Sequence, residues 1–405
     1  MISAAARAVL AGLALAATAA LAQPADARRN AEDFDALWKA VDQSYPYFES
    51  RAAWRRARDT WRPRAARAAS RGELAAALEG LLAELRDDHA SLSERTARRR
   101  VPMEADLWGA WKDNAATVES VRTFGDADVA GLRPGDVVVR IDGVPAERAV
   151  RERLGKGAVA GPAARDWALR QVLAGPRTGA LSLELRSAGS TRRVDVERRD
   201  AASANGPPIL SRRIGMERDL GYLRIKSSLD DPQLVKHFDA ALTMLRGTRA
   251  MIIDLREVTG GSSHAATLAI LGRFTAAAAP WQVREGADRK RETDVVQPRG
   301  LPYVEPMVVL VDRWTAGEGE ALAAGLAAVA KARLLGTPMA GLRGELREVR
   351  LPHSGIVARF PAEKVLTPGG TPRERLLPSV PVDLVGPQAG PGDPILYKAL
   401  KLLER

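Results

Sequence analysis

From about residue 209 onward, short apolar runs alternate with longer amphipathic segments, and this alternation restricts the folds open to the chain. The apolar runs at 221–225, 250–256 and 306–312 have the length and composition of buried strands. The segments at 231–247 and 317–332 have the length and residue spacing of helices. Buried strands that alternate with helices predict a layered α/β domain with a largely parallel sheet.

Two different patterns precede this α/β domain, which we place at residues 205–390. Residues 30–100 carry apolar positions at helical spacing, for example Phe34 and Leu37, and predict a small helical unit. Residues 101–200 carry short strands separated by glycine-containing turns, and predict a compact β-rich domain. The chain is therefore predicted to combine helical, β-rich and α/β domains in a multidomain α+β arrangement.

Residues 1–22 have the pattern of an export signal. A single basic residue, Arg7, is followed by an alanine- and leucine-rich run that ends in Ala20-Leu21-Ala22. Such a short run with an Ala-x-Ala end is typical of a cleaved signal peptide. We expect an exported mature protein, periplasmic or secreted, with an uncleaved N-terminal anchor as the alternative. No later stretch approaches the ~20 apolar residues that span a bilayer, so no stable membrane span is expected after cleavage.

The 405-residue chain contains no cysteine, which excludes disulfides, thiolate metal sites and a cysteine nucleophile. Its net charge of +11 comes mainly from arginines that are interleaved with acids and alanines. No nucleic-acid-binding motif accompanies them, so we interpret them as solvated helix faces, with weak adhesion to an anionic surface as the alternative. The histidine and carboxylate spacings typical of metal sites are also absent, and neither a metal nor another cofactor is expected.

The segment "VLVDRWTAGEGEAL", residues 309–322, predicts a strand that passes through a tight glycine turn into a helix. Many α/β hydrolytic enzymes present their nucleophile on such a turn. Between Thr315 and Glu320, however, there is no serine and no cysteine. Glu318 and Glu320 are two residues apart on the helix and do not face each other, which argues against a paired-carboxylate acid–base site.

The order of the segments "GYLRI", "AMIIDLREVTGG", "PMVVLVDRWTAGEGEALA" and "LLGTPMAG" resembles the core of the tail-specific (C-terminal processing) serine peptidases and their tricorn-core relatives. A helical prelude that ends in "RDDHAS" fits the same family, as does the inserted "GLRPGDVVVRIDG", which resembles a PDZ-domain signature. The resemblance extends over almost everything after the signal peptide. It implies a ClpP/crotonase-like α/β core, a helical N-terminal unit and an inserted PDZ-like β domain.

The resemblance also implies positions for the catalytic residues. The family's serine stands in a "T-x-S-x-G-E" phrase, and here that position is Gly317. One branch of the family uses a lysine in the stretch that reads "GTPMAGLRG" here, where no lysine is present. The tricorn-like branch uses a histidine of the helical prelude, which implies His89 as the base, and an acid late in the chain, for which Glu374 is the candidate. The chain therefore resembles the tricorn-like branch with its nucleophile replaced.

Acyl transfer also needs backbone N–H groups that meet the negative oxygen forming on the attacked carbonyl. By resemblance, Gly260 and Gly261 are the candidates for one donor, and the amide of Glu318 at the helix start is the candidate for the other. A helix N-terminus favours negative charge, which suits this role.

Another hydroxyl could stand in for the missing serine. Thr315 lies two residues before the serine position, and Ser262 and Ser263 follow the glycine pair. The alternative is that Thr315 packs or caps locally and that the two serines cap the next helix, in whose first turn His264 lies.

The PDZ-like domain is by type a peptide-binding module, which adds an extended chain to a sheet edge and holds its terminal carboxylate. Leu107, Trp108 and Gly109 are the candidate binding loop, with a plain aromatic core strand as the alternative. Because a glycine cannot attack a carbonyl, we predict a pseudopeptidase that binds peptides or unfolded protein C-termini. An active serine-type endopeptidase that uses a displaced hydroxyl is the alternative. No nucleic-acid partner is expected, and the sequence does not define an oligomeric state.

Overall fold

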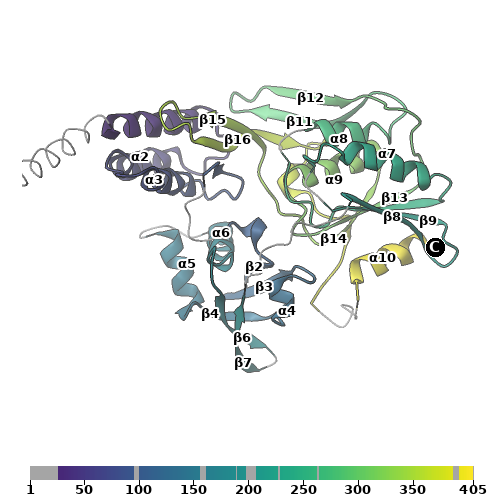
Figure 1. Cartoon of the computed structure of the whole chain (residues 1–405), viewed down its shortest axis with the longest axis horizontal. Helices are drawn as coiled ribbons and strands as arrows, with labels where there is room; N and C mark the ends of the chain where they lie inside the picture. The colour runs from purple at the N-terminus through teal and green to yellow at the C-terminus, as the bar shows by residue number, and fades with distance from the viewer. Residues whose placement is uncertain are drawn as a thin grey trace, which may run out of the picture. The chain divides into compact units, whose positions relative to one another are not determined.

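The computed structural model of the chain contains two compact units (Figure 1). The first comprises Met1–Ala97 and Glu345–Glu363, and the second comprises Arg98–Gly344 and Lys364–Arg405. The structure describes residues 26–94, 100–155, 161–187, 189–197, 207–226, 229–261, 264–385 and 392–404. The predicted export signal lies outside these residues. None of the helices among them is long and apolar enough to cross a membrane.

The first unit is built on three helices, namely residues 26–44, α2 Arg51–Ala66 and α3 Arg71–Ala83. The apolar positions predicted at helical spacing are buried, since Phe34 and Leu37 lie in one apolar cluster with residues of α2 and α3. Both α2 and α3 begin after a serine whose side chain accepts a backbone N–H of the first turn, which satisfies donors that a helix start leaves unpaired.

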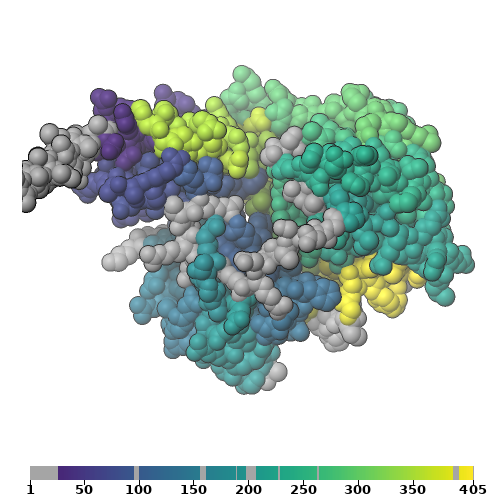
Figure 2. Space-filling view, in the orientation of Figure 1, coloured from purple at the N-terminus to yellow at the C-terminus, as the bar shows by residue number. Residues whose placement is uncertain are grey.

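The hairpin formed by residues 345–363 also belongs to the first unit. Its turn is held by Asp33, whose buried carboxylate accepts the N–H groups of His353 and Ser354 at 2.8 Å each. Figure 2 shows the hairpin, in yellow-green, on the surface beside the purple first helix. We had predicted residues 345–363 in the α/β domain, and these bonds explain why they join the helical unit instead. The antiparallel strands here are β1 Ser91–Leu92, β15 Glu345–Arg350 and β16 Val357–Leu366.

The second unit begins with a β-rich domain whose sheet is antiparallel throughout. The strand order is β2-β3-β4-β6-β7, so β2 and β7 are the sheet edges. The strands are β2 Leu107–Lys112, β3 Ala115–Val121, β4 Val137–Ile141, β5 Val144–Pro145, β6 Leu181–Ser187 and β7 Ser190–Val196. The helices are η1 Pro102–Glu104, α4 Asp126–Val129, α5 Ala146–Leu154 and α6 Pro162–Leu173.

The α/β part of the second unit contains a six-stranded sheet in the order β17-β14-β13-β10-β9-β8. Every neighbouring pair from β9 to β17 is parallel and only β8 is antiparallel to its neighbour, which confirms the predicted largely parallel sheet. All residues of β10 and β13 are buried, as expected for strands covered on both faces. The strands are β8 Ile209–Ile214, β9 Leu220–Ile225, β10 Ala250–Asp254, β13 Met307–Val311, β14 Arg333–Gly336 and β17 Val380–Pro381. The hairpin of β11 Ala279–Gly286 and β12 Arg291–Val296 lies outside this sheet.

Helices cover both faces of this sheet. Alternate strand residues point to opposite faces, and those of one face form a large apolar core with α7, α8 and α9. Those of the other face form a smaller core with α10. The helices are α7 Leu234–Met244, α8 His264–Leu271, α9 Glu318–Val329, η2 Arg373–Arg375 and α10 Pro394–Leu403.

The helix α10 lies beyond residue 390, where we had predicted the α/β domain to end. Asp393 caps the helix by accepting the Leu396 N–H at 3.0 Å. The Arg256 guanidinium donates to both carboxylate oxygens of Asp393, at 2.8 and 2.7 Å, and also to the buried Asp254 at 2.7 Å. Burial opposes the charge on Asp393, but the bonds from Arg256 outweigh it and lower the pKa of this carboxyl. The bidentate ion pair therefore anchors α10 to the end of β10.

Candidate active site

The predicted strand–turn–helix at residues 309–322 is present, with β13 leading through a turn into α9. Gly317 is the N-cap residue of α9, at φ 56° and ψ −114°. An L-residue at such a positive φ is strained, by on the order of 1–3 kcal/mol. Strained strand-to-helix turns of this kind display the nucleophile of α/β hydrolytic enzymes. The predicted serine position, Gly317, thus lies on a strained turn between a strand and a helix.

Hydrogen bonds of Asp312 and Thr315 fix the start of the turn. The Asp312 carboxylate accepts the N–H groups of Trp314 at 2.9 Å and Thr315 at 3.0 Å. Burial raises the pKa of Asp312 to about 6, although the Trp314 N–H works in the opposite direction. The Thr315 hydroxyl is fully buried, donates to the Leu255 carbonyl at 3.0 Å and accepts the Asp312 N–H at 3.0 Å. Thr315 is therefore part of the scaffold, and its hydroxyl is engaged and shielded from substrate.

Glu320 fixes the other end of the turn. Its fully buried carboxylate accepts three backbone N–H groups, from Gly317 at 3.1 Å, Gly341 at 2.9 Å and Leu342 at 3.1 Å. Burial raises the pKa of this carboxyl to about 7, although the nearby Arg373 charge and the three N–H groups lower it. Glu320 therefore ties the start of α9 to the loop that follows β14. Sequence reasoning gave Glu320 no such role, because the loop that it binds lies about twenty residues along the chain.

The Glu318 carboxylate has different partners from those of Glu320. One of its carboxylate oxygens lies 3.0 Å from His264 Nδ1 and accepts the Thr267 hydroxyl at 2.8 Å. Gly261 makes room for this side chain, because a Cβ there would lie 2.6 Å from Glu318 Cγ. His264 Nε2 lies 3.4 Å from the amide nitrogen of Gln282. His264 is thus a partner of the residue that follows Gly317, whereas the sequence indicated only a first-turn position in its helix.

The candidate oxyanion donors are not equivalent. The Gly260 N–H donates to the Ala316 carbonyl at 3.0 Å, so this amide is engaged within the fold. Gly261 has a φ of 147°, which glycine adopts more readily than other residues. Glu318 is the first residue of α9, so its N–H has no partner within the helix. Gly261 and Glu318 remain the candidate donors, and Ser262 and Ser263 lie outside the described residues.

The predicted base and acid belong to different units. His89 lies in the first unit, where its N–H donates to Asp87 Oδ1 at 3.0 Å and the other oxygen of Asp87 accepts the Tyr45 hydroxyl at 2.7 Å. Glu374 lies in η2 of the second unit, and a Cβ on Gly341 would lie 3.3 Å from its carbonyl oxygen. The structure thus brings Glu374 and the Glu320-bound loop together. The catalytic roles of His89 and Glu374 stay predictions.

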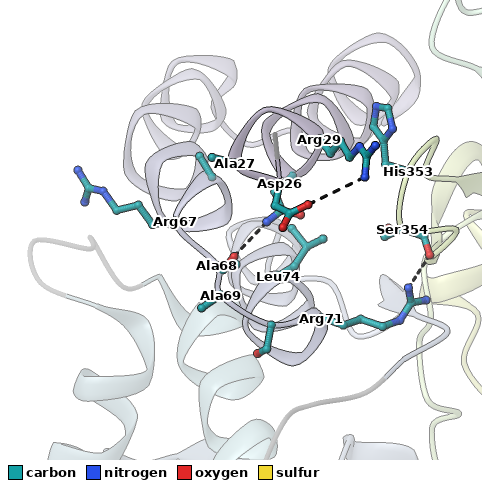
Figure 3. A pocket seen from close by; sticks show the side chains of 13 residues that line it. Asp26, Ala27, Arg29, Arg67, Ala68, Ala69, Arg71, Leu74, His353 and Ser354 are labelled. Atoms are coloured by element: carbon teal, nitrogen blue, oxygen red, sulfur yellow. Dashed lines mark hydrogen bonds and ion pairs between the residues drawn. The ribbon is translucent and has the colours of Figure 1, made fainter. Parts of the chain in front are cut away.

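A cavity of about 570 Å³ lies in the first unit (Figure 3). Several of its polar lining groups are paired with others of the lining. Arg71 donates to the Ser354 carbonyl at 2.6 Å, Asn30 donates to the Ala68 carbonyl at 3.2 Å, and Arg29 lies 4.0 Å from Asp26.

The candidate peptide-binding stretch is a strand of the β-rich domain. Leu107 and Trp108 are buried in β2, and Gly109 packs against α6. This burial agrees with the alternative interpretation of the stretch, an aromatic core strand, although β2 is also an edge of its sheet.

The parallel sheet and the glycine turn together define a peptidase-like α/β unit. Residues 219–382 match the model of peptidase family S41, and residues 26–83 match the model of the tricorn protease C1 domain. The predicted resemblance to the tail-specific serine peptidases, with tricorn-like features, is therefore confirmed. A search of curated proteins finds none that matches the sequence.

Several solved structures share the fold. The photosystem II D1 C-terminal processing protease is 18% identical, with 93% of this chain and 97% of that chain covered and a TM-score of 0.57. Mature CPAF complexed with lactacystin is 15% identical, with 93% and 97% covered and a TM-score of 0.58. A putative peptidase from Parabacteroides merdae is 17% identical, with 94% and 97% covered and a TM-score of 0.55. At these identities the likeness establishes a shared fold.

Proposed function

We propose that the protein is an exported pseudopeptidase, which binds peptides or unfolded protein C-termini in a peptidase cleft without cleaving them. One observation carries this proposal: Gly317 occupies the strained N-cap position of α9 from which a nucleophile would project. A glycine has no side-chain oxygen or sulfur, so no acyl-enzyme can form at this position.

The surroundings of Gly317 support binding rather than general decay of the cleft. Asp312 and Thr315 hold the turn before it, and Glu320 holds the turn after it, through hydrogen bonds of 2.9–3.1 Å. The N-terminal end of α9 carries a partial positive charge and the amide of Glu318, which has no partner within the helix. A carbonyl or carboxylate oxygen of a bound peptide is the kind of group that this helix end favours.

An active peptidase with a displaced hydroxyl is the second candidate. Thr315 does not suit it, because its hydroxyl is fully buried and donates to a backbone carbonyl. Ser262 and Ser263 are the hydroxyls left for this candidate, since they follow the glycine pair in the sequence.

The test is turnover of an unfolded protein substrate by the purified mature protein, together with labelling by a fluorophosphonate probe. We expect the natural protein to be silent in both assays, and Gly317→Ser to gain labelling because the rest of the turn is intact. Gly317→Ala is the matched control, because it adds the same backbone strain without a hydroxyl.

Each outcome decides between the two candidates. Cleavage or labelling by the natural protein would overturn the pseudopeptidase proposal, and Ser262→Ala and Ser263→Ala would then locate the nucleophile. Silence of a folded Gly317→Ser variant would contradict an otherwise intact catalytic cleft and leave peptide binding as the function.

Export is the second part of the proposal, and the Ala-x-Ala end at residues 20–22 supports it. We expect protein recovered from the periplasm or the medium to begin at Gln23, which N-terminal sequencing measures directly. Full-length protein retained in the membrane or cytoplasmic fraction would contradict it.

A further inference from the structure

The outer edge of β2 is the place in the β-rich domain where an extended chain could add to the sheet. Among the residues that the structure describes, β2 pairs with β3 alone and stands at the end of the strand order, so its other side is an edge of the sheet. Extended peptides bind many domains by adding a strand to such an edge.

In this structure a side chain of the protein's own helix α6 occupies that edge. The Trp111 N–H, in β2, donates to Asp166 Oδ1 at 2.6 Å across 55 residues of sequence. The acceptor is a carboxylate, which is also the group that ends every free peptide chain. Asp166 therefore offers this N–H the same type of acceptor that the terminal carboxylate of an incoming peptide would offer.

Apolar side chains of α6 close the remaining space against β2. A Cβ on Gly109 would lie 2.4 Å from Leu173 Cδ1 and 3.2 Å from Leu169 Cδ2, so strand and helix are in direct contact here. Leu169 and Leu173 are both buried. At Gly109, therefore, α6 and β2 leave no space for a further side chain between them.

The charges around the contact suit an anionic ligand. The Arg165 guanidinium lies 4.2 Å from the centre of the Trp111 ring, and the Arg170 guanidinium lies 5.1 Å from the centre of the Trp108 ring. The indole Nε1 of Trp111 is buried and has no hydrogen-bond acceptor among the residues that the structure describes. A carboxylate that replaced Asp166 on the Trp111 N–H would thus bind beside a residue whose ring already carries a guanidinium group, that of Arg165.

We propose that Asp166 is an internal competitor that holds the β2 edge closed, and that the C-terminal carboxylate of an extended peptide displaces it. This inference rests on the proposed peptide-binding function and adds a gating residue to it. Asp166 and a peptide carboxylate cannot both accept the Trp111 N–H at 2.6 Å, so each lowers the apparent affinity of the edge for the other. The closed form reduces peptide affinity by the fraction of molecules that it occupies.

The test compares peptide binding by the full mature protein and by Asp166→Ala. The probe is a fluorescein-labelled peptide with apolar C-terminal residues, made once with a free carboxylate and once with a C-terminal amide, and read by fluorescence anisotropy. Asp166→Ala is expected to bind the carboxylate peptide about tenfold more tightly, a typical effect for one charge-assisted hydrogen bond. The amide peptide is expected to gain less, because its neutral carbonyl profits from the open edge but not from the loss of the Asp166 charge.

Two further variants make the result specific. Asp166→Asn keeps the size of the side chain and is expected to give a smaller gain, and it carries the test if Asp166→Ala does not fold. Asp195→Ala makes the same change of charge on the opposite edge strand, β7, and is expected to leave affinity unchanged.

The inference is overturned if the folded Asp166 variants bind the carboxylate peptide no better than the natural protein, or if the amide peptide gains equally. An equal gain from Asp195→Ala would also overturn it, because net charge would then explain the effect. Cleavage of the peptide by the natural protein would refute the pseudopeptidase proposal while leaving the role of Asp166 to be decided by the affinities.

Discussion

Replacing Glu320 by alanine is expected to lower the free energy of unfolding by about 3 kcal/mol, because three buried N–H groups lose their acceptor together. The substitution also removes the negative charge that faces Arg373, a side chain that is only 3% exposed. The loop at Gly341 and Leu342 should then separate from the start of α9. Urea denaturation at constant pH measures the loss, and a difference below the error of the extrapolation would contradict this role for Glu320.

The same carboxyl makes stability depend on pH. Burial raises the pKa of Glu320 from 4.5 to about 7, so between these values the folded state holds a proton that the unfolded state has released. The contribution of Glu320 to the free energy of unfolding is fully present below about pH 4.5 and is lost as the pH rises through 7. We therefore expect Glu320→Gln to reduce the difference in stability between pH 5 and pH 8, by at most about 3 kcal/mol. Asp312, whose pKa is raised to about 6, also makes stability depend on pH, but it does so equally in the natural protein and in Glu320→Gln. An unchanged pH dependence would show that Glu320 does not titrate in this range.

Gly336→Ala is expected to destabilise the fold by more than about 4 kcal/mol, which is exceptional for a single substitution. A Cβ at this position would lie 2.0 Å from the Val311 carbonyl oxygen, and the glycine has a φ of 142°. The opposing atom belongs to the backbone of β13, so relief requires that β13 and β14 separate. Because Val311 is the last residue of β13, the displacement reaches the turn at Gly317.

Gly370→Ala is the control for that substitution. Gly370 also has a positive φ, of 86°, but a Cβ there would meet nothing within 4 Å. It should cost only about 1 kcal/mol, the strain of the backbone conformation. Thermal denaturation of the two variants separates steric conflict from backbone strain, and equal losses would contradict the steric explanation.

The layered α/β fold was predictable because a fully buried strand has an uninterrupted run of apolar residues. β10 and β13 are covered on both faces, so every position is buried and the apolar runs are uninterrupted. The turn at Gly317 was predictable for a similar reason, since strand, glycines and helix follow one another directly. Such local patterns indicate whether a segment forms a strand, a turn or a helix, without reference to the segments that pack against it.

The rest of the site depends on contacts that no local pattern records. Glu320 binds the loop after β14, and Glu318 binds His264, which lies 54 residues earlier. The assignment of 345–363 to the helical unit depends on Asp33, more than three hundred residues away. In each case an ordinary charged or polar residue acquires its role from a partner brought close by the whole fold. Spacing along the chain therefore gave no signal for these pairs.

The anchoring of α10 has a consequence for recognition between copies of this protein. A segment can add to a sheet edge only when its backbone is extended and its N–H groups are available. In α10 the backbone groups form hydrogen bonds within the helix, and Ile395 and Ala399 are buried. Arg256 forms an ion pair with Asp393 at the helix start. Residues 393–403, held in this helix, therefore do not offer an extended backbone that could add to a sheet edge.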